Sequence, residues 1–164
     1  MDHIQIFELL REKFGPDKVL EHIVTGDEKK GFRDPFILVK TEALPEIALF
    51  LRDHETTRFD LLHCLSAVEW PEYFESVAHL WSMSHRHWAI VKVRVGKADP
   101  HVPSLSSIWP AANWHEREAY DLMGIVYDDH PDLRRILLPD EWEGHPLRKD
   151  YVMPEHERLR HLGL

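Results

Sequence analysis

The sequence predicts a two-layer α+β domain, in which a mainly antiparallel sheet packs on helices, followed by an extended carboxyl-terminal arm. Apolar residues recur at helical spacing in some segments, and they alternate at strand spacing in others that short connectors join. Past Tyr127 all periodicity ends, and prolines interrupt the chain at near-regular intervals (Pro131, Pro139, Pro146 and Pro154). We therefore divide the chain into an α+β domain, residues 1–127, and an arm, residues 128–164.

The amino-terminal part is predicted to form one helix and two strands. Apolar side chains recur at helical spacing over residues 3–14, and Gly15–Pro16 ends that helix. Val19–Val24 and Pro35–Lys40 have strand patterns on either side of a polar turn at Gly26–Gly31.

The middle of the chain is predicted to add a second helix and three consecutive strands. Pro45 suits the first turn of a helix that extends through Arg52. Arg58–Trp70, Tyr73–Ser84 and Trp88–Val95 alternate like strands, and their short connectors are typical of antiparallel hairpins. Alternation groups the following residues on common faces: Phe59, Leu61, His63 and Leu65; Tyr73, Val77, Trp81 and Met83; Ala89, Val91, Val93 and Val95, with Lys92 and Arg94 opposite.

A third helix is predicted from Pro110 to Met123, and Gly124 ends it. Its expected core stripe comprises Ala112, His115, Ala119, Leu122 and Met123. The other side is charged but contains Trp114. Either a loop of the same chain covers this side chain, or it anchors a subunit interface in which Glu116, Arg117, Glu118 and Asp121 make polar contacts around it. Periodicity leaves both interpretations open.

The composition excludes several classes of protein. A net charge of -9 argues against a nucleic-acid binder, which needs basic residues for phosphate contacts. Cys64 is the only cysteine, so an internal disulfide, a multi-cysteine zinc site and a cysteine-ligated iron–sulfur cluster are excluded. We expect no membrane span and no signal peptide, because no segment approaches the roughly 18 apolar residues of a spanning helix.

No catalytic, cofactor-binding or metal site is expected. His79, His85 and His87 fall at a strand edge and in a turn, and His115-Glu116 lacks the second histidine of a zinc-protease motif. Cys64 lies in an apolar run, where a thiol is inert.

The arm carries too many apolar and aromatic residues for a plain disordered tail, so we expect it to dock on another surface. Trp142 and the run Leu133–Leu138 supply much of this apolar content. The basic pairs Arg134-Arg135 and Arg148-Lys149 are either solvated charges or partners for acidic groups on another polypeptide.

These same segments resemble a known family. Asn113–Leu137, NWHEREAYDLMGIVYDDHPDLRRIL, and its continuation LPDEWEGHPLRKDY are similar to the signature of the C subunit of respiratory complex I, the proton-translocating NADH:quinone oxidoreductase. Val102–Trp109 is similar to the lead-in of that signature. Asp128-Asp129 departs from it, because a glycine is expected just before His130-Pro131. The J-type branch of the family remains an alternative to the C-type branch, and a fusion with the quinone-site protein of the complex is not expected.

The resemblance implies a non-catalytic subunit of the peripheral arm, on the cytoplasmic side of the cell membrane. It implies packing against the quinone-site subunit (the D-type protein of the complex) and cluster-bearing neighbours, with FMN, iron–sulfur clusters and quinone on other subunits. The expected partner interface comprises Trp114, Glu116, Arg117, Glu118, Asp121, His130, Pro131, Asp132, Arg134, Arg135, Trp142, Arg148, Lys149 and Asp150.

Two other functions stay open. Related subunits occur in membrane-bound energy-converting hydrogenases and in ferredoxin- or F420-linked oxidoreductases. A free-standing acidic binding module, unconnected with electron transfer, is a third interpretation.

Overall fold

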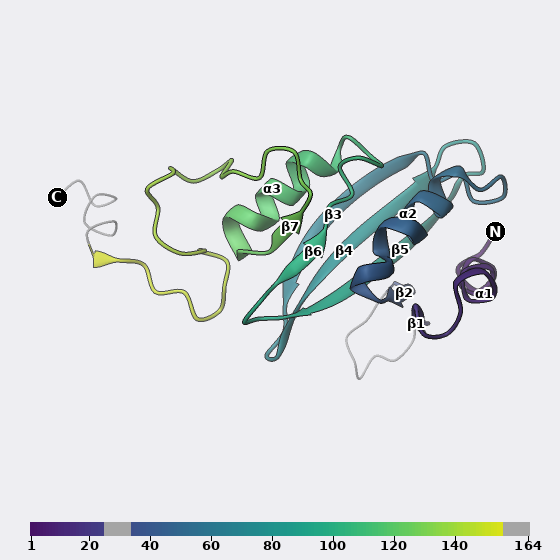
Figure 1. Ribbon diagram of the computed structural model, residues 1–164, viewed down its shortest axis with the longest axis horizontal. Coiled ribbons are helices and arrows are strands. Elements are labelled where there is room, and N and C mark those ends of the chain that lie inside the picture. Colours follow the sequence, from purple (N-terminus) through teal and green to yellow (C-terminus); the bar gives the residue numbers. More distant parts are fainter. Residues whose placement is uncertain (25–33, 156–164) are drawn as a thin grey trace.

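The computed structural model describes residues 1–24 and 34–155, and the predicted α+β class is confirmed (Figure 1). The main sheet has five strands in the order β1-β2-β5-β4-β3, and a second sheet pairs β6 with β7. The elements, in chain order, are α1 (His3–Phe14), β1 (Val19–Ile23), β2 (Phe36–Val39), the 3-10 helix η2 (Thr41–Ala43), α2 (Leu44–Asp53), β3 (Leu61–Glu69), β4 (Tyr73–Ser82), β5 (His87–Gly96), β6 (His101–Pro103), α3 (Ala112–Met123) and β7 (Val126–Asp128).

The three long strands form the antiparallel part of the sheet, as the alternation predicts. β4 pairs with β3 on one side and with β5 on the other, both antiparallel. On β5, the predicted inward face is confirmed, since Ala89, Val91, Val93 and Val95 all belong to the main core. Figure 1 shows α2 lying across the front of the sheet and α3 near its β3 side.

The opposite face of the sheet carries a buried charge cluster. Lys92 and Arg94 point to this face, as predicted, and both pair with Glu75 of β4. The Glu75 side chain is fully buried, with Lys92 Nζ at 3.2 Å and Arg94 Nε at 2.9 Å. Two cations therefore compensate one carboxylate that would otherwise be costly to bury.

The face predicted for β3 is wrong over its first residues. Leu62 is buried, whereas Leu61 is 38% exposed and His63 is exposed. The pairing register with β4 shifts between Leu62 and Cys64, which is a β-bulge. A bulge reverses which residues face the core, and simple alternation does not reveal it.

Two features of the sheets were not predicted from the pattern. β2 pairs parallel with β5, so α2 belongs to a crossover between them. The strands β6 and β7 span three residues each, which is too short for a periodic signal. The polar turn expected at Gly26–Gly31 lies outside the described residues.

Candidate partner interface

Helix α3 and the arm form one closely packed unit. Gly124 ends the helix with φ 74°, the left-handed conformation that favours glycine. A Cβ added at Gly124 would lie 2.4 Å from the Arg148 guanidinium and 2.6 Å from the His145 ring. The arm therefore packs directly over the end of α3, where there is no room for a larger residue.

The arm also satisfies the last carbonyl groups of α3. A helix leaves its final carbonyls without partners in the helix, and buried ones need donors from elsewhere. Here the donors come from one short stretch of the arm. The bonds join His145 Nδ1 to Asp121 O (2.9 Å), Leu147 N to Leu122 O (3.0 Å) and Arg148 Nε to Met123 O (2.7 Å).

Asp121 is the main anchor of the arm. Its Oδ1 accepts from Arg135 Nη1 at 2.7 Å, and its Oδ2 accepts from the backbone N–H groups of Ile136, Leu137 and Leu138 at 3.0, 2.7 and 2.9 Å. Burial alone would raise the pKa of Asp121. The backbone donors of Leu138 and Leu137, together with Arg135, outweigh burial and hold this pKa below its ordinary value.

Two arginines extend this network along the arm. Arg117 of α3 donates to the carbonyls of Arg134 and Arg135, both at 3.1 Å. Arg135 in turn donates from Nη2 to the carbonyls of Trp142 and Gly144, at 3.0 and 3.1 Å. The planar guanidinium groups thus hold two separate stretches of the arm against one helix face.

Glu116 lies on the buried side of α3 toward the loop that precedes it. Its carboxylate accepts from Ser104 Oγ and from Leu105 N, both at 2.6 Å. His130 Nε2 lies 3.9 Å from Glu116 Oε2 and donates to Asn113 O at 3.1 Å. Burial raises the pKa of Glu116 to about 7, although the bonds from Ser104 and Leu105 oppose the rise.

Several residues predicted for the partner interface are therefore used inside the chain. The side chains of Glu116, Asp121 and His130 are fully buried, and Arg117 is only 9% exposed. Arg135 and Arg148 likewise bond to α3. These contacts within the chain were not predicted, because a helical wheel shows which residues share a face, but not which segment covers that face. The partner contacts of these residues stay a prediction.

The predicted core stripe of α3 needs a matching correction. Ala112, Ala119 and Met123 are buried as expected, but His115 and Leu122 are not fully buried. Polar residues with specific partners take their place, which apolar periodicity does not detect.

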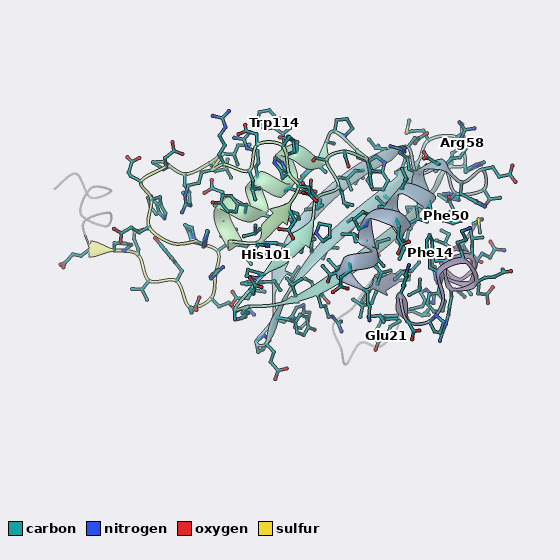
Figure 2. The ribbon with its side chains drawn as sticks, viewed as in Figure 1. Phe14, Glu21, Phe50, Arg58, His101 and Trp114 are labelled. Carbon is teal, nitrogen blue, oxygen red and sulfur yellow. The ribbon has the colours of Figure 1, made fainter. Side chains whose placement is uncertain are left out.

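Other predicted interface residues remain at the surface. Trp114 is 63% exposed, so none of the described residues forms the covering loop that was its alternative explanation. Figure 2 shows Trp114 on the outer side of α3, and the Arg117 guanidinium lies 5.5 Å from its ring centre. Glu118, Pro131, Asp132, Arg134, Lys149 and Asp150 are also exposed, and Trp142 is partly buried.

The arm exposes apolar residues that the sequence reasoning did not select. Leu137 is 61% exposed and Leu147 is 59% exposed, although the backbone of each is bonded to α3. We name the surface that contains Trp114, Glu118, Arg134, Leu137 and Leu147 the α3–arm surface. Both leucines stand in the signature block. The sequence alone does not show that their backbone groups are bonded to α3 while their side chains stay exposed.

Part of the arm is also tied to the main sheet. Glu69 at the end of β3 accepts from the backbone N–H of Lys149 at 2.6 Å, and it pairs with Lys97 of the loop after β5. The predicted division of the chain at residue 127 stays a prediction. The contacts of Asp121 and Glu69 nevertheless attach much of the arm to the preceding domain.

The described residues contain no helix that is long and apolar enough to cross a membrane. Within residues 1–24 and 34–155, no three His, Cys, Asp or Glu side chains are grouped as metal ligands.

Comparisons with known proteins add a family match. Residues 37–157 match the family described as respiratory-chain NADH dehydrogenase, 30 Kd subunit. The chain is 42% identical over 93% of its length to the C subunit of the NADH-quinone oxidoreductase of Chloroherpeton thalassium, of which it spans 62%. It is 41% identical over 91% of its length to the corresponding C subunit of Chlorobium phaeobacteroides, of which it spans 88%.

Two solved structures share the fold. One belongs to the membrane-bound sulfane sulfur reductase, an archaeal respiratory membrane complex. It has a TM-score of 0.72 and 25% identity, with 97% of this chain and 91% of that chain covered. The other is a trypsin-resistant fragment of Nqo5, with a TM-score of 0.60, 25% identity, and 79% and 98% of the two chains covered.

Proposed function

This chain belongs to the 30 Kd subunit family of respiratory-chain NADH dehydrogenase, and on that premise we propose that it is a peripheral-arm subunit of an NADH:quinone oxidoreductase. In this role it organises neighbouring subunits and has no catalytic site of its own. Its partners are a quinone-site subunit and cluster-bearing subunits, which carry the FMN, iron–sulfur clusters and quinone. The complex holds it on the cytoplasmic side of the membrane.

One structural observation supports a scaffold role in particular. Every buried ionisable side chain of α3 is used to fix the arm or the loop before the helix, so the α3–arm surface is held in one shape. On that surface Trp114 and Leu137 are both more than half exposed. A rigid surface with an exposed Trp and an exposed Arg134 is typical of a protein–protein interface.

Copurification tests this proposal directly. The chain, tagged at its amino terminus, is expressed in place of the native subunit, extracted from membranes in mild detergent and analysed by mass spectrometry. We expect flavin- and cluster-bearing NADH dehydrogenase subunits in constant stoichiometry with the chain. Recovery of the chain without any of them would contradict the proposed function.

A second candidate function has support from the fold comparison. The sulfane sulfur reductase structure covers 97% of this chain, which shows that a different membrane complex uses the same fold. The 25% identity to that chain is nevertheless well below the 41–42% identity to the two bacterial NADH-quinone oxidoreductase relatives. The same copurification distinguishes the two candidate functions, because a hydrogenase-type or sulfur-reducing complex would contain no NADH- and flavin-binding subunit to copurify with the chain.

A further inference from the structure

The strand β3 lies at the edge of the five-stranded sheet and is nine residues long. Among the described residues, none gives or receives a backbone hydrogen bond along its outer side. Edge strands in soluble proteins are normally guarded by Lys or Pro, or by being very short. Between Leu61 and Val68, β3 contains neither of these residues, and it contains no Asp, Glu or Arg.

The hairpin between β3 and β4 fixes which backbone groups point outward. Trp70 N donates to Tyr73 O at 2.9 Å, so Trp70 and Tyr73 form a hydrogen-bonded pair. Such pairs alternate along an antiparallel ladder, so Val68, Ser66 and Cys64 also bond to β4. The N–H and C=O groups of Leu65 and Ala67 therefore point to the free edge.

Hollows lie on both faces beside this edge. On the helix side, a hollow of about 330 Å³ lies between β3 and α3, and Ala67, Leu122 and Leu147 are among its lining residues. On the opposite side, a hollow of about 460 Å³ is lined by Leu61, Trp81 and Trp88, among others. Side chains of a strand alternate between the two faces of a sheet, so alternate residues of a strand paired with Leu65 and Ala67 reach the helix-side hollow. The β3 residues of the opposite hollow lie toward Leu61, past the bulge between Leu62 and Cys64.

We propose that β3 is a strand-addition site, at which an extended segment of a different polypeptide pairs with Leu65 and Ala67. The edge supplies hydrogen bonds that only an extended backbone can match, which identifies the occupant as a strand. The occupant carries apolar side chains on the face toward α3, because the helix-side hollow is mainly apolar. Glu118 lines the helix-side hollow and is exposed, so the occupant carries Lys or Arg at the position that meets it.

This inference rests on the proposed function, since it requires a larger complex that contains the chain. It adds the location and the conformation of one partner segment. The added strand is short, because the bulge between Leu62 and Cys64 limits it at one end. The arm limits it at the other, where Lys149 N bonds to Glu69.

Amide hydrogen exchange resolved to single residues tests the strand addition, with the isolated chain compared with the complex purified from membranes. In the isolated chain we expect fast exchange at Leu65 and Ala67, and slow exchange at Cys64, Ser66 and Val68. In the complex, we expect exchange at Leu65 and Ala67 to slow by at least about 100-fold. Slow exchange at both residues in the isolated chain, or no slowing in the complex, would overturn the inference.

A backbone variant gives an independent readout. Ala67→Pro removes one outward N–H, and proline is tolerated at an edge position whose N–H is not used within the sheet. The control is Ala67→Ser, which keeps that N–H. We expect Ala67→Pro to reduce the amount of assembled complex at least about fivefold relative to Ala67→Ser, with both isolated chains folded. Equal assembly of the two folded variants contradicts the proposal.

Photo-crosslinking identifies the occupant and does not depend on the proline variant. A benzophenone amino acid at Ser66, incorporated into the chain within the intact complex, reports the neighbouring segment by mass spectrometry. We expect a peptide from another subunit with apolar residues and a Lys or Arg. A crosslink to a second copy of this chain, or to no polypeptide, overturns the inference. Copurification with partners and no slowing at Leu65 and Ala67 would refute strand addition alone and leave the proposed function intact.

Discussion

Arg135 Nη1 lies 2.7 Å from Asp121 Oδ1, and this pair joins the arm to α3 inside the chain. The Asp121 side chain is fully buried and the Arg135 side chain is 15% exposed. The other carboxylate oxygen of Asp121 accepts hydrogen bonds from three backbone N–H groups of the arm. Asp121 therefore fixes the path of the arm backbone and also neutralises the charge of Arg135. The α3–arm surface is consequently built on a support that these bonds hold in place.

Asp121→Asn is expected to destabilise the chain by about 3 kcal/mol, because it leaves Arg135 without its buried counter-charge. The control is Asp132→Asn, since Asp132 pairs with Arg134 at 2.9 Å where both side chains are more than half exposed. We expect that control to cost less than about 0.5 kcal/mol. Urea unfolding of both variants measures the difference, and equal losses would show that Asp121 does not anchor the arm.

Glu116 is expected to make the free energy of unfolding of the chain depend measurably on pH. Its pKa is raised from 4.5 to about 7 in the folded state, so the folded chain binds more protons than the unfolded chain between these values. The stability that protonated Glu116 contributes is therefore fully present below about pH 4.5. About 3 kcal/mol of it is lost as pH rises through about 7. Glu116→Gln keeps the shape of the side chain and removes this titration.

The test compares unfolding free energies of Glu116→Gln and the parent chain from pH 5 to pH 8. Burial lowers the pKa of His87 and His145, but both residues titrate alike in the two proteins and cancel in the difference. We expect the difference to grow in favour of the variant as pH rises. A difference that stays flat over this range would mean that Glu116 titrates in the folded chain as it does in solvent.

Trp114→Ala is expected to weaken assembly without unfolding the chain. Its side chain is 63% exposed, so its loss should change the stability of the isolated protein by less than about 0.5 kcal/mol. At an interface, loss of a central Trp costs about 2 kcal/mol or more, which corresponds to at least about tenfold weaker association. The control is Leu49→Ala, 45% exposed on α2. Native gels of membranes carrying each variant should show reduced complex for Trp114→Ala alone.

Asp129→Gly is expected to stabilise the chain by about 0.5–1 kcal/mol. Asp129 has φ 61°, a left-handed conformation in which a Cβ is strained and a glycine is not. This is the position at which the family resemblance leads one to expect a glycine. Thermal unfolding measures the change, and a lower melting temperature would indicate that the Asp129 side chain makes a compensating interaction.

The sequence was sufficient to predict those elements that have a clear period. The three helices and the Ala89–Val95 alternation of β5 were predicted because the sheet and the helices obey simple spacing rules. The first residues of β3 were predicted on the wrong face, because one bulge shifts the register without changing the composition. The parallel pairing of β2 with β5 was not predicted, since the partner of a short strand depends on the whole topology.

The candidate site was predicted as a region but not residue by residue. Trp114 and Arg134 were chosen and are exposed, whereas Glu116 and Asp121 were chosen and are buried. All four stand in one irregular signature block, and the block alone does not tell which side chains hold the chain to itself. Which side chains are used inside the chain depends on how the arm packs back over α3. This packing brings hydrogen-bond donors to Asp121 from residues 14 to 17 positions further along the chain.

Hydroxyl-radical footprinting of Trp114 decides whether a partner covers the α3–arm surface, with the isolated chain and the membrane-purified complex labelled side by side. We expect Trp114 to be strongly oxidised in the isolated chain and at least about fivefold less in the complex. Equal oxidation of Trp114 in the two samples would contradict the scaffold role, because it would show that this surface stays open to solvent after assembly.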